Sequence, residues 1–328
     1  MAKGKWQMAN QDLASGGLGQ EYGDWGWLYA VCVRASPDIS YRTPIPARPV
    51  EAIEIAHPAV PAGLDGVTIL HVSDLHVRRA MPGTERSRMV LEALARTEAD
   101  LIVLTGDLMD EPGHEAGALE VVRAMAGVWR ARHGVFGVFG NHDTPHFQRA
   151  CRDGIPGIRW IGGEVVEVAI GGEILGLMGM DWPEDPLEVM LGREKGSRDR
   201  GIEGSGDPTS TPRSHDPSTP LVALAHHPNS LIGAATMGIP ILLAGHTHAG
   251  QIRLHPRLAP HTSSDLPMHL ASGMLRLQDT LCCITRGLGD GVVEGLRINC
   301  ARQMPLYSLR RGGMPGGSGG GVEQVVGW

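Results

Sequence analysis

The sequence predicts an α/β fold, because short apolar runs of strand length alternate along the chain with helix-like segments. The clearest helix-like segments are residues 85–97 and 114–132, which lie between successive apolar runs. Further along, residues 165–170 and 174–178 flank Gly171 and Gly172 and have the pattern of a β-hairpin. The hairpin adds antiparallel strands, so we expect the sheets to be mixed.

Five of the apolar runs end at a short polar motif. The runs are residues 67–71, 101–104, 135–139, 221–224 and 241–243, and the motifs are HVSDLH (71–76), GD (106–107), GNHD (140–143), AHHP (225–228) and GHTH (245–248). In α/β sheets, ligands bind at the carboxyl ends of the strands. We therefore expect the five motifs to converge on one crevice.

The side chains of these motifs are those of a metal site. They offer carboxylate, amide and imidazole groups but no thiolate, which favours Mn, Fe, Zn or Mg over a structural zinc cage. In extended backbone, residues two apart point the same way, so positions 74 and 76, and positions 246 and 248, can each face one cluster. Two ions roughly 3.5 to 4 Å apart need a bridging carboxylate. The candidate bridge is Asp107, and the full set is Asp74, His76, Asp107, Asn141, His226, His246 and His248.

The five motifs, in this order, resemble those of the calcineurin-like metallophosphoesterase superfamily. The resemblance spans residues 50–309, and two further motifs, GHTHAGQIRL and TRGLGDG, are similar to a bacterial single-domain phosphodiesterase branch. It implies a sandwich of two mixed β-sheets flanked by helices. It also implies two divalent ions, the first held by Asp74, His76, Asp107 and His248 and the second by Asp107, Asn141, His226 and His246.

The same resemblance implies an enzyme that hydrolyses a phosphoester, and we expect a phosphodiester or pyrophosphate bond. The nucleophile would be a metal-activated hydroxide, with His142 as the general acid that protonates the leaving oxygen. The expected substrate is a small phosphodiester, a nucleotide or a lipid-linked phosphate. The alternatives are a hydrolase of a UDP-diacylglucosamine-type lipid precursor, a nuclease and a catalytically inactive metal-binding scaffold.

Two of these assignments keep an alternative. His226 and His227 are adjacent, so we expect their side chains to point apart, and the family pattern His-X-Pro selects His226 as the ligand. Asp110 is the first candidate to orient His142, and Asp143 is the second. Either carboxylate would favour the protonated imidazole that a general acid requires.

The composition divides the chain into three parts. Residues 1–48 form an N-terminal extension that is rich in Trp and Tyr and could be a substrate lid, a membrane-interface patch or a segment packed on the domain. Residues 49–311 form the metallophosphoesterase domain, in which residues 192–219, rich in Gly, Ser and Pro, are expected to be a mobile loop. Residues 312–328 are a Gly-rich tail.

The charge and the cysteine content indicate which partners and which cellular compartment to expect. The net charge is −7 and no block of Lys and Arg resembles a nucleic-acid footprint, which argues against nucleic acid as a partner. The five cysteines have no disulfide or metal-site spacing, and no apolar run approaches the roughly 20 residues that span a bilayer. We expect a cytoplasmic protein, with peripheral contact at the inner membrane as the alternative, and no protein partner is implied.

Overall fold

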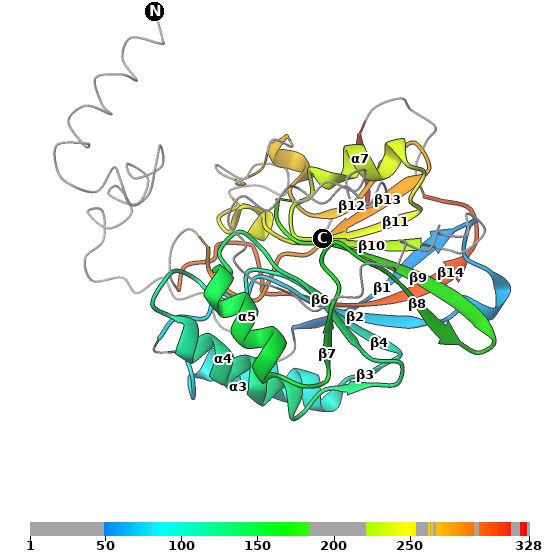
Figure 1. Ribbon diagram of the computed structural model, residues 1–328. Coiled ribbons are helices and arrows are strands. Elements are labelled where there is room, and N and C mark those ends of the chain that lie inside the picture. The colour runs from blue at the N-terminus through cyan, green and yellow to red at the C-terminus, as the bar shows by residue number, and fades with distance from the viewer. Residues whose placement is uncertain are drawn as a thin grey trace, which may run out of the picture.

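The computed structural model of the protein describes residues 49–79, 81–183, 221–253, 262, 264, 267–291, 295–315 and 322–326. The predicted extension 1–48 and the predicted loop 192–219 lie outside these residues. The described chain forms two large β-sheets with helices on both outer sides (Figure 1). The predicted sandwich of two mixed sheets flanked by helices is confirmed.

The first sheet has six strands in the order β1-β14-β2-β4-β6-β7. Strands β2, β4, β6 and β7 are parallel, whereas β14 pairs antiparallel with β2 and parallel with β1. The carboxyl ends of β2, β4 and β6 therefore lie at the same edge of the sheet. The bounds are β1 Val50–His57, β14 Met304–Arg311, β2 Thr68–Val72, β4 Leu101–Thr105, β6 Val135–Val138 and β7 Ile158–Trp160.

The second sheet has seven strands in the order β15-β12-β13-β11-β10-β9-β8. Strands β9, β10, β11 and β13 are parallel, and the outer strands β8, β12 and β15 pair antiparallel. Strands β8 and β9 are the predicted hairpin. The bounds are β15 Glu323–Val326, β12 Gly273–Leu277, β13 Thr280–Ile284, β11 Ile241–Ala244, β10 Leu221–Ala225, β9 Glu173–Met180 and β8 Val165–Ile170.

Helices cover the outer face of each sheet, with α3, α4 and α5 against the first sheet and α7 against the second (Figure 1). The predicted helix over 114–132 is shorter than expected, because Gly127 ends α4 and residues 130–131 instead form a short strand. This strand, β5 (Arg130–Ala131), pairs with β3 (Glu98–Ala99). The helix bounds are α3 Glu85–Arg96, α4 Glu115–Ala126, α5 Pro145–Gly154 and α7 Ser230–Thr236.

Alternation along the strands creates separate cores on the two faces of each sheet. In β4, Leu101 and Val103 join the core between the sheets, whereas Ile102 and Leu104 join the core under the helices. Both faces of the central strands are thus buried, which explains why these runs are continuously apolar. Polar side chains can emerge only where the strands end.

The end of the chain differs from the prediction. Residues 323–326, expected in a Gly-rich tail outside the domain, form β15 and pair with β12 at the edge of the second sheet. Their sequence, EQVV, has the β-branched residues that a strand favours. Among the residues that the structure describes, no helix has the length and apolar character needed to cross a membrane.

Candidate metal centre

The loops that carry the polar motifs meet at very close range. Gly106, which has a φ of +86°, lies so close to the GNHD loop that a Cβ there would be 2.3 Å from the Gly140 nitrogen. A Cβ on Gly140 would in turn be 2.2 Å from Oδ1 of Asp107. Only glycine fits either position, and this contact sets the GNHD loop directly against the Asp107 carboxylate.

The backbone of the candidate ligands is not extended. Five of them have a positive φ, a region that non-glycine residues seldom occupy and that costs about 1–3 kcal/mol per residue. The expectation that an extended chain turns alternate residues toward one cluster is therefore wrong for both spaced pairs. Tight left-handed loops aim these side chains: Asp74 (53°), His76 (43°), Asp107 (49°), His246 (72°) and His248 (48°).

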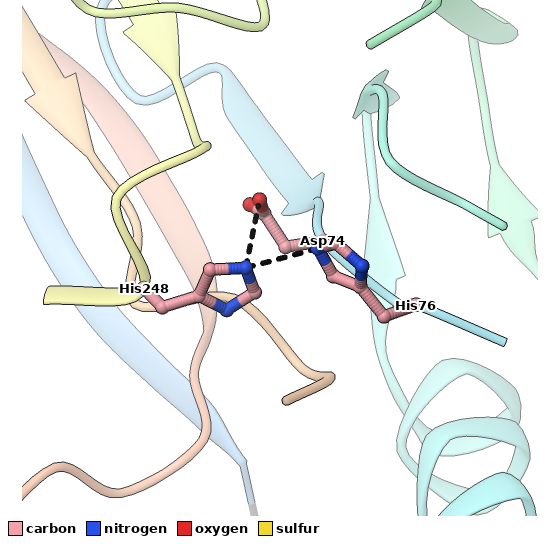
Figure 2. Close-up of side chains that lie close together, drawn as sticks. All are labelled: Asp74, His76 and His248. Carbon is pink, nitrogen blue, oxygen red and sulfur yellow. Dashed lines mark hydrogen bonds and ion pairs between the residues drawn. The ribbon is translucent and has the colours of Figure 1, made fainter. Parts of the chain in front are cut away.

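Asp74, His76 and His248 form a first cluster, which we call the buried cluster (Figure 2). Nε2 of His248 lies 3.0 Å from Nε2 of His76 and 3.6 Å from Oδ1 of Asp74. All three side chains are buried. Behind His76, Nδ1 contacts a carboxylate oxygen of Asp110 at 3.1 Å, so Nδ1 carries a proton and Nε2 is left to bind a metal.

Asp107, His226 and His246 form a second cluster, which we call the open cluster because His246 is partly exposed. Nε2 of His226 lies 3.0 Å from Oδ2 of Asp107 and 3.1 Å from Nδ1 of His246. The same Asp107 oxygen lies 3.5 Å from Nε2 of His76, so this carboxylate faces both clusters. It occupies the position that a bridging ligand requires.

The charges within the two clusters are strongly coupled. Burial acts to raise the pKa of Asp107, but the imidazoles of His226 and His76 outweigh it and hold this pKa well below its usual range. Burial likewise acts to lower the pKa of His226, yet the Asp107 charge and hydrogen bond raise it to about 9. In the protein alone, a protonated His226 balances Asp107. A bound dication would displace such protons, as metal ligands must be deprotonated.

The donor set fits a pair of divalent ions. Oδ2 of Asp74 is buried and accepts no hydrogen bond from the residues that the structure describes. An unpaired buried acceptor costs about 1–3 kcal/mol, and more when charged, so a cation beside it would remove a real penalty. Facing imidazole nitrogens and carboxylate oxygens are ligands for Mn, Fe or Zn.

His142 lies at the mouth of the centre, and neither predicted carboxylate holds its imidazole. Its Nε2 is 4.0 Å from Oδ2 of Asp107, and its side chain is 39% exposed. Its Nδ1 faces the main-chain carbonyl of Asp110, whereas the Asp110 carboxylate contacts His76 and Arg78. The contact between Asp110 and His142 is therefore made by the main-chain oxygen of Asp110, and an orienting role for its carboxylate stays a prediction.

Asp143, the alternative, has a different partner set. Its carboxylate accepts hydrogen bonds from the backbone nitrogens of Leu108, Met109 and Gly140 at 2.9–3.1 Å. Burial, reinforced by the charge of Asp107, raises the pKa of Asp143 to about 7. The side chain thus ties the GNHD loop to the loop after β4 through main-chain nitrogens.

Of the remaining sequence-predicted residues, His226 and His227 both contact His246. Asn141 is exposed, between Gly140 and His142. His226 directs Nε2 into the cluster, while its Nδ1 contacts the Thr105 carbonyl at 2.7 Å. His227 instead packs its ring against those of His246 and Trp182, with centroid distances of 4.1 and 5.0 Å.

Sequence reasoning missed a buried ion cluster behind His248. Arg297 is completely buried, with Nη2 3.2 Å from Nδ1 of His248 and Nε 3.3 Å from a carboxylate oxygen of Asp290. Arg86 and Arg302 also pair with Asp290, at 2.9 and 2.7 Å. The TRGLGDG motif that contains Asp290 was visible in the sequence, but no local pattern distinguished Arg297.

The same motif packs on the buried cluster through its glycines. A Cβ on Gly287 would be 2.6 Å from Cβ of Asp74, and one on Gly291 would be 2.6 Å from Nε2 of His248. A Cβ on Gly289 would be 2.3 Å from the Leu75 carbonyl. The glycines of TRGLGDG are therefore explained by close contact with the centre.

Comparison with known proteins gives a consistent result. The family model described as "Calcineurin-like phosphoesterase" matches residues 67–250, which contain every motif around the two clusters except TRGLGDG. "Uncharacterized metallophosphoesterase YkuE" of Bacillus subtilis is 25% identical over 88% of this chain and 95% of its own length. "Phosphodiesterase YaeI" of Escherichia coli is 25% identical over 74% of this chain and 81% of its own.

Solved structures give a more distant likeness. The crystal structure of phosphopantetheinyl hydrolase from Mycobacterium tuberculosis aligns over 67% of this chain and 88% of that chain. The sequence identity is 12% and the TM-score is 0.35. A likeness of this size supports no statement about activity or substrate.

Proposed function

Because the chain belongs to the calcineurin-like phosphoesterase family and is a metal-dependent phosphoesterase, we propose that it hydrolyses phosphodiester or pyrophosphate bonds at the two clusters. One observation carries the proposal. A single carboxylate oxygen of Asp107 lies 3.0 Å from His226 and 3.5 Å from His76, so one ligand reaches both clusters. That arrangement suits two adjacent ions and the clamping of one phosphoryl group between them.

The two clusters would each hold one ion, with the same assignment of ligands that the family resemblance implies. Asp74, His76 and His248 would hold one ion and share Asp107 with the other. His226, His246 and the exposed Asn141 would complete the second. When bound, two divalent ions would polarise the phosphoryl oxygens and supply a hydroxide near neutral pH.

We assign to His142 the role of protonating the leaving oxygen. Nδ1 can donate its proton to the Asp110 carbonyl, so the proton that the doubly protonated imidazole would give to the leaving oxygen is the one on Nε2. Its partly exposed side chain lies at the mouth of the site, where a substrate arrives. The backbone nitrogen of His142 also donates to Oδ1 of Asp107 at 2.9 Å, which fixes the loop against the bridge. A general acid in this place contributes about a hundred- to ten-thousandfold.

The relatives favour a diester as the substrate. Among them is a protein named as a phosphodiesterase, which this chain matches over 81% of that protein's length. Mn is the first ion to test, because the donors are imidazole and carboxylate. The experiment below separates three alternatives: hydrolysis of a lipid-linked precursor, hydrolysis of a nucleic acid, and metal binding without turnover.

The test is a substrate panel with the protein loaded with Mn, Zn, Fe or Mg. Phosphomonoesters, aryl and alkyl phosphodiesters, nucleotides, lipid pyrophosphates and single-stranded DNA would each be assayed at several salt concentrations. We expect turnover of small diesters or pyrophosphates. Activity on DNA alone, with steep salt dependence, would indicate a nuclease. Binding of two ions per chain without hydrolysis of any substrate would indicate a scaffold and contradict the proposal.

A further inference from the structure

Trp182 is a large aromatic side chain that is exposed at the rim of the candidate centre. It follows β9 and is 45% exposed. Its ring is nearly parallel to that of His246, with an interplanar angle of 10° and a centroid distance of 6.5 Å. This places an exposed indole beside a histidine of the open cluster.

The position of Trp182 is fixed by its neighbours. Its backbone nitrogen donates to the Phe139 carbonyl at 3.1 Å, and the Asp181 carboxylate accepts from the Phe139 nitrogen at 2.8 Å. Arg152 holds the other oxygen of Asp181, also at 2.8 Å. The rim around Trp182 is thus joined to the strand end from which the GNHD loop starts.

One face of the indole is already covered. His227 stacks on Trp182 with a centroid distance of 5.0 Å and an interplanar angle of 27°. His227 in turn packs on His246 at 4.1 Å, so the three rings form a layer that leads from the rim to the open cluster. Because Trp182 is nonetheless 45% exposed, it offers apolar ring surface at the end of this layer.

We propose that Trp182 forms a subsite that stacks a planar aromatic substituent of the substrate, such as a nucleobase or an aryl ring, while the phosphoryl group lies at the two clusters. This inference rests on the proposed function. A flat π-face prefers a planar partner, since offset stacking adds to the gain from burial. Stacking of one base on an aromatic side chain is worth about tenfold or more in affinity.

Three phosphonates separate this subsite from a general apolar contact, because their C–P bond is not hydrolysed. Phenylphosphonate carries a planar ring, cyclohexylphosphonate a ring of similar size that is not planar, and methylphosphonate no ring. Their affinities for the Mn-loaded full chain would be measured by calorimetry and by competition against an aryl diester. The variants are Trp182→Ala, Trp182→Phe and the control Ile174→Ala. Ile174 is equally exposed, at 45%, at the other end of β9.

We expect Trp182→Ala to weaken phenylphosphonate about tenfold and to leave methylphosphonate and the Mn stoichiometry unchanged. Trp182→Phe should retain most of the preference, and Ile174→Ala should behave as the wild type. Equal losses for the phenyl and cyclohexyl compounds would overturn the planar subsite. So would a loss that includes methylphosphonate, because Trp182 would then support the centre itself. If no phosphonate binds to the wild type, the proposed function fails as well.

Discussion

The two clusters of the centre are held in opposite ways. The buried cluster is enclosed by protein groups, with Arg297 and Asp110 directly behind its histidines and the glycines of TRGLGDG packed on it. The open cluster includes the partly exposed His246, which lies beside the exposed ring of Trp182. The partly exposed His142 lies between the two clusters, next to Asp107 and the His76 ring. One cluster is thus enclosed by protein groups, whereas the other lies beside exposed side chains.

The pKa values of the histidines differ within the centre. Burial lowers the pKa of His248 well below its usual value, and the neighbouring His76 and Arg297 lower it further. His226, by contrast, has its pKa raised to about 9, because Asp107 outweighs the effect of burial. In the buried cluster, burial acts to lower the pKa of His76, but Asp110, Asp107 and Asp74 outweigh it and raise this pKa. Each cluster therefore contains one histidine with a raised pKa, and Arg297 adds positive charge behind the buried one.

The largest effect is expected at the residue that joins the two clusters. Asp107→Asn should remove the bridge, because one neutral amide cannot balance two dications. Loss of a group that supports a metal ligand from behind typically lowers activity by up to about a hundredfold. Loss of the bridging ligand itself should lower activity by more than that, and metal analysis should find fewer than two ions per chain. Asp153→Asn, on the exposed side of α5, is the control. Two ions and near-normal turnover in the Asp107 variant would contradict the assignment.

The next effect is expected at His142, which lies beside Asp107 and the His76 ring. His142→Asn should keep both ions and should slow alkyl diesters by about a hundred- to ten-thousandfold. Nitrophenyl diesters should be slowed far less, because a nitrophenolate scarcely needs a proton to leave. Exposed His146, on α5, gives the matched control His146→Asn. Equal losses on both substrates, or loss of an ion, would show that His142 binds metal or phosphate instead.

The buried side is tested through stability. Asp290→Asn should leave Arg86, Arg297 and Arg302 without their shared carboxylate, which costs about 3–5 kcal/mol for a buried pair. Urea unfolding measures the loss. The control is Glu98→Gln, whose pair with Arg132 is more than half exposed and should contribute less than about 1 kcal/mol. Equal losses in both variants would show that the buried ion cluster does not stabilise the fold.

The contribution of Asp290 should also appear in the pH dependence of the free energy of unfolding. Burial acts to raise the pKa of Asp290, but Arg302, Arg297 and Arg86 outweigh it, so the pKa lies below its usual value. For such a group, the stabilisation is complete above the unfolded pKa of about 4. It is lost as the pH falls through the lower folded pKa. The difference in stability between wild type and Asp290→Asn should therefore shrink in acid.

The smallest effect distinguishes the side chain of Asp110 from its backbone. Asp110→Asn should weaken metal binding at the buried cluster about ten- to hundredfold, because the carboxylate holds His76. The ratio of alkyl to nitrophenyl rates should not change, since the variant keeps the carbonyl that faces His142. Exposed Glu111→Gln is the control. A changed ratio with normal metal binding would mean that the carboxylate orients His142 after all.

Much of the fold followed from local sequence. Runs such as 101–104 are apolar at every position because both faces of the strand are buried, and this pattern located the central strands to within a residue or two. The hairpin of β8 and β9 was equally local, since Gly171 and Gly172 both adopt a positive φ. Residues 323–326 were not assigned to a strand, because their partner β12 is distant in sequence.

For the centre, the sequence by itself determined which residue types follow each strand. It also predicted that these residues meet, because the carboxyl ends of parallel strands lie at one edge of a sheet, where ligands bind. Only the tertiary structure decided which side chains contact the predicted metal ligands from outside the clusters. Asp110 lies 34 residues from His76, and Arg297 lies 49 residues from His248. No periodicity links such pairs, because their contact depends on how separate loops pack. The left-handed backbone of Asp74 and the ring layer of Trp182 arise in the same way, from the close approach of loops that the sequence keeps apart.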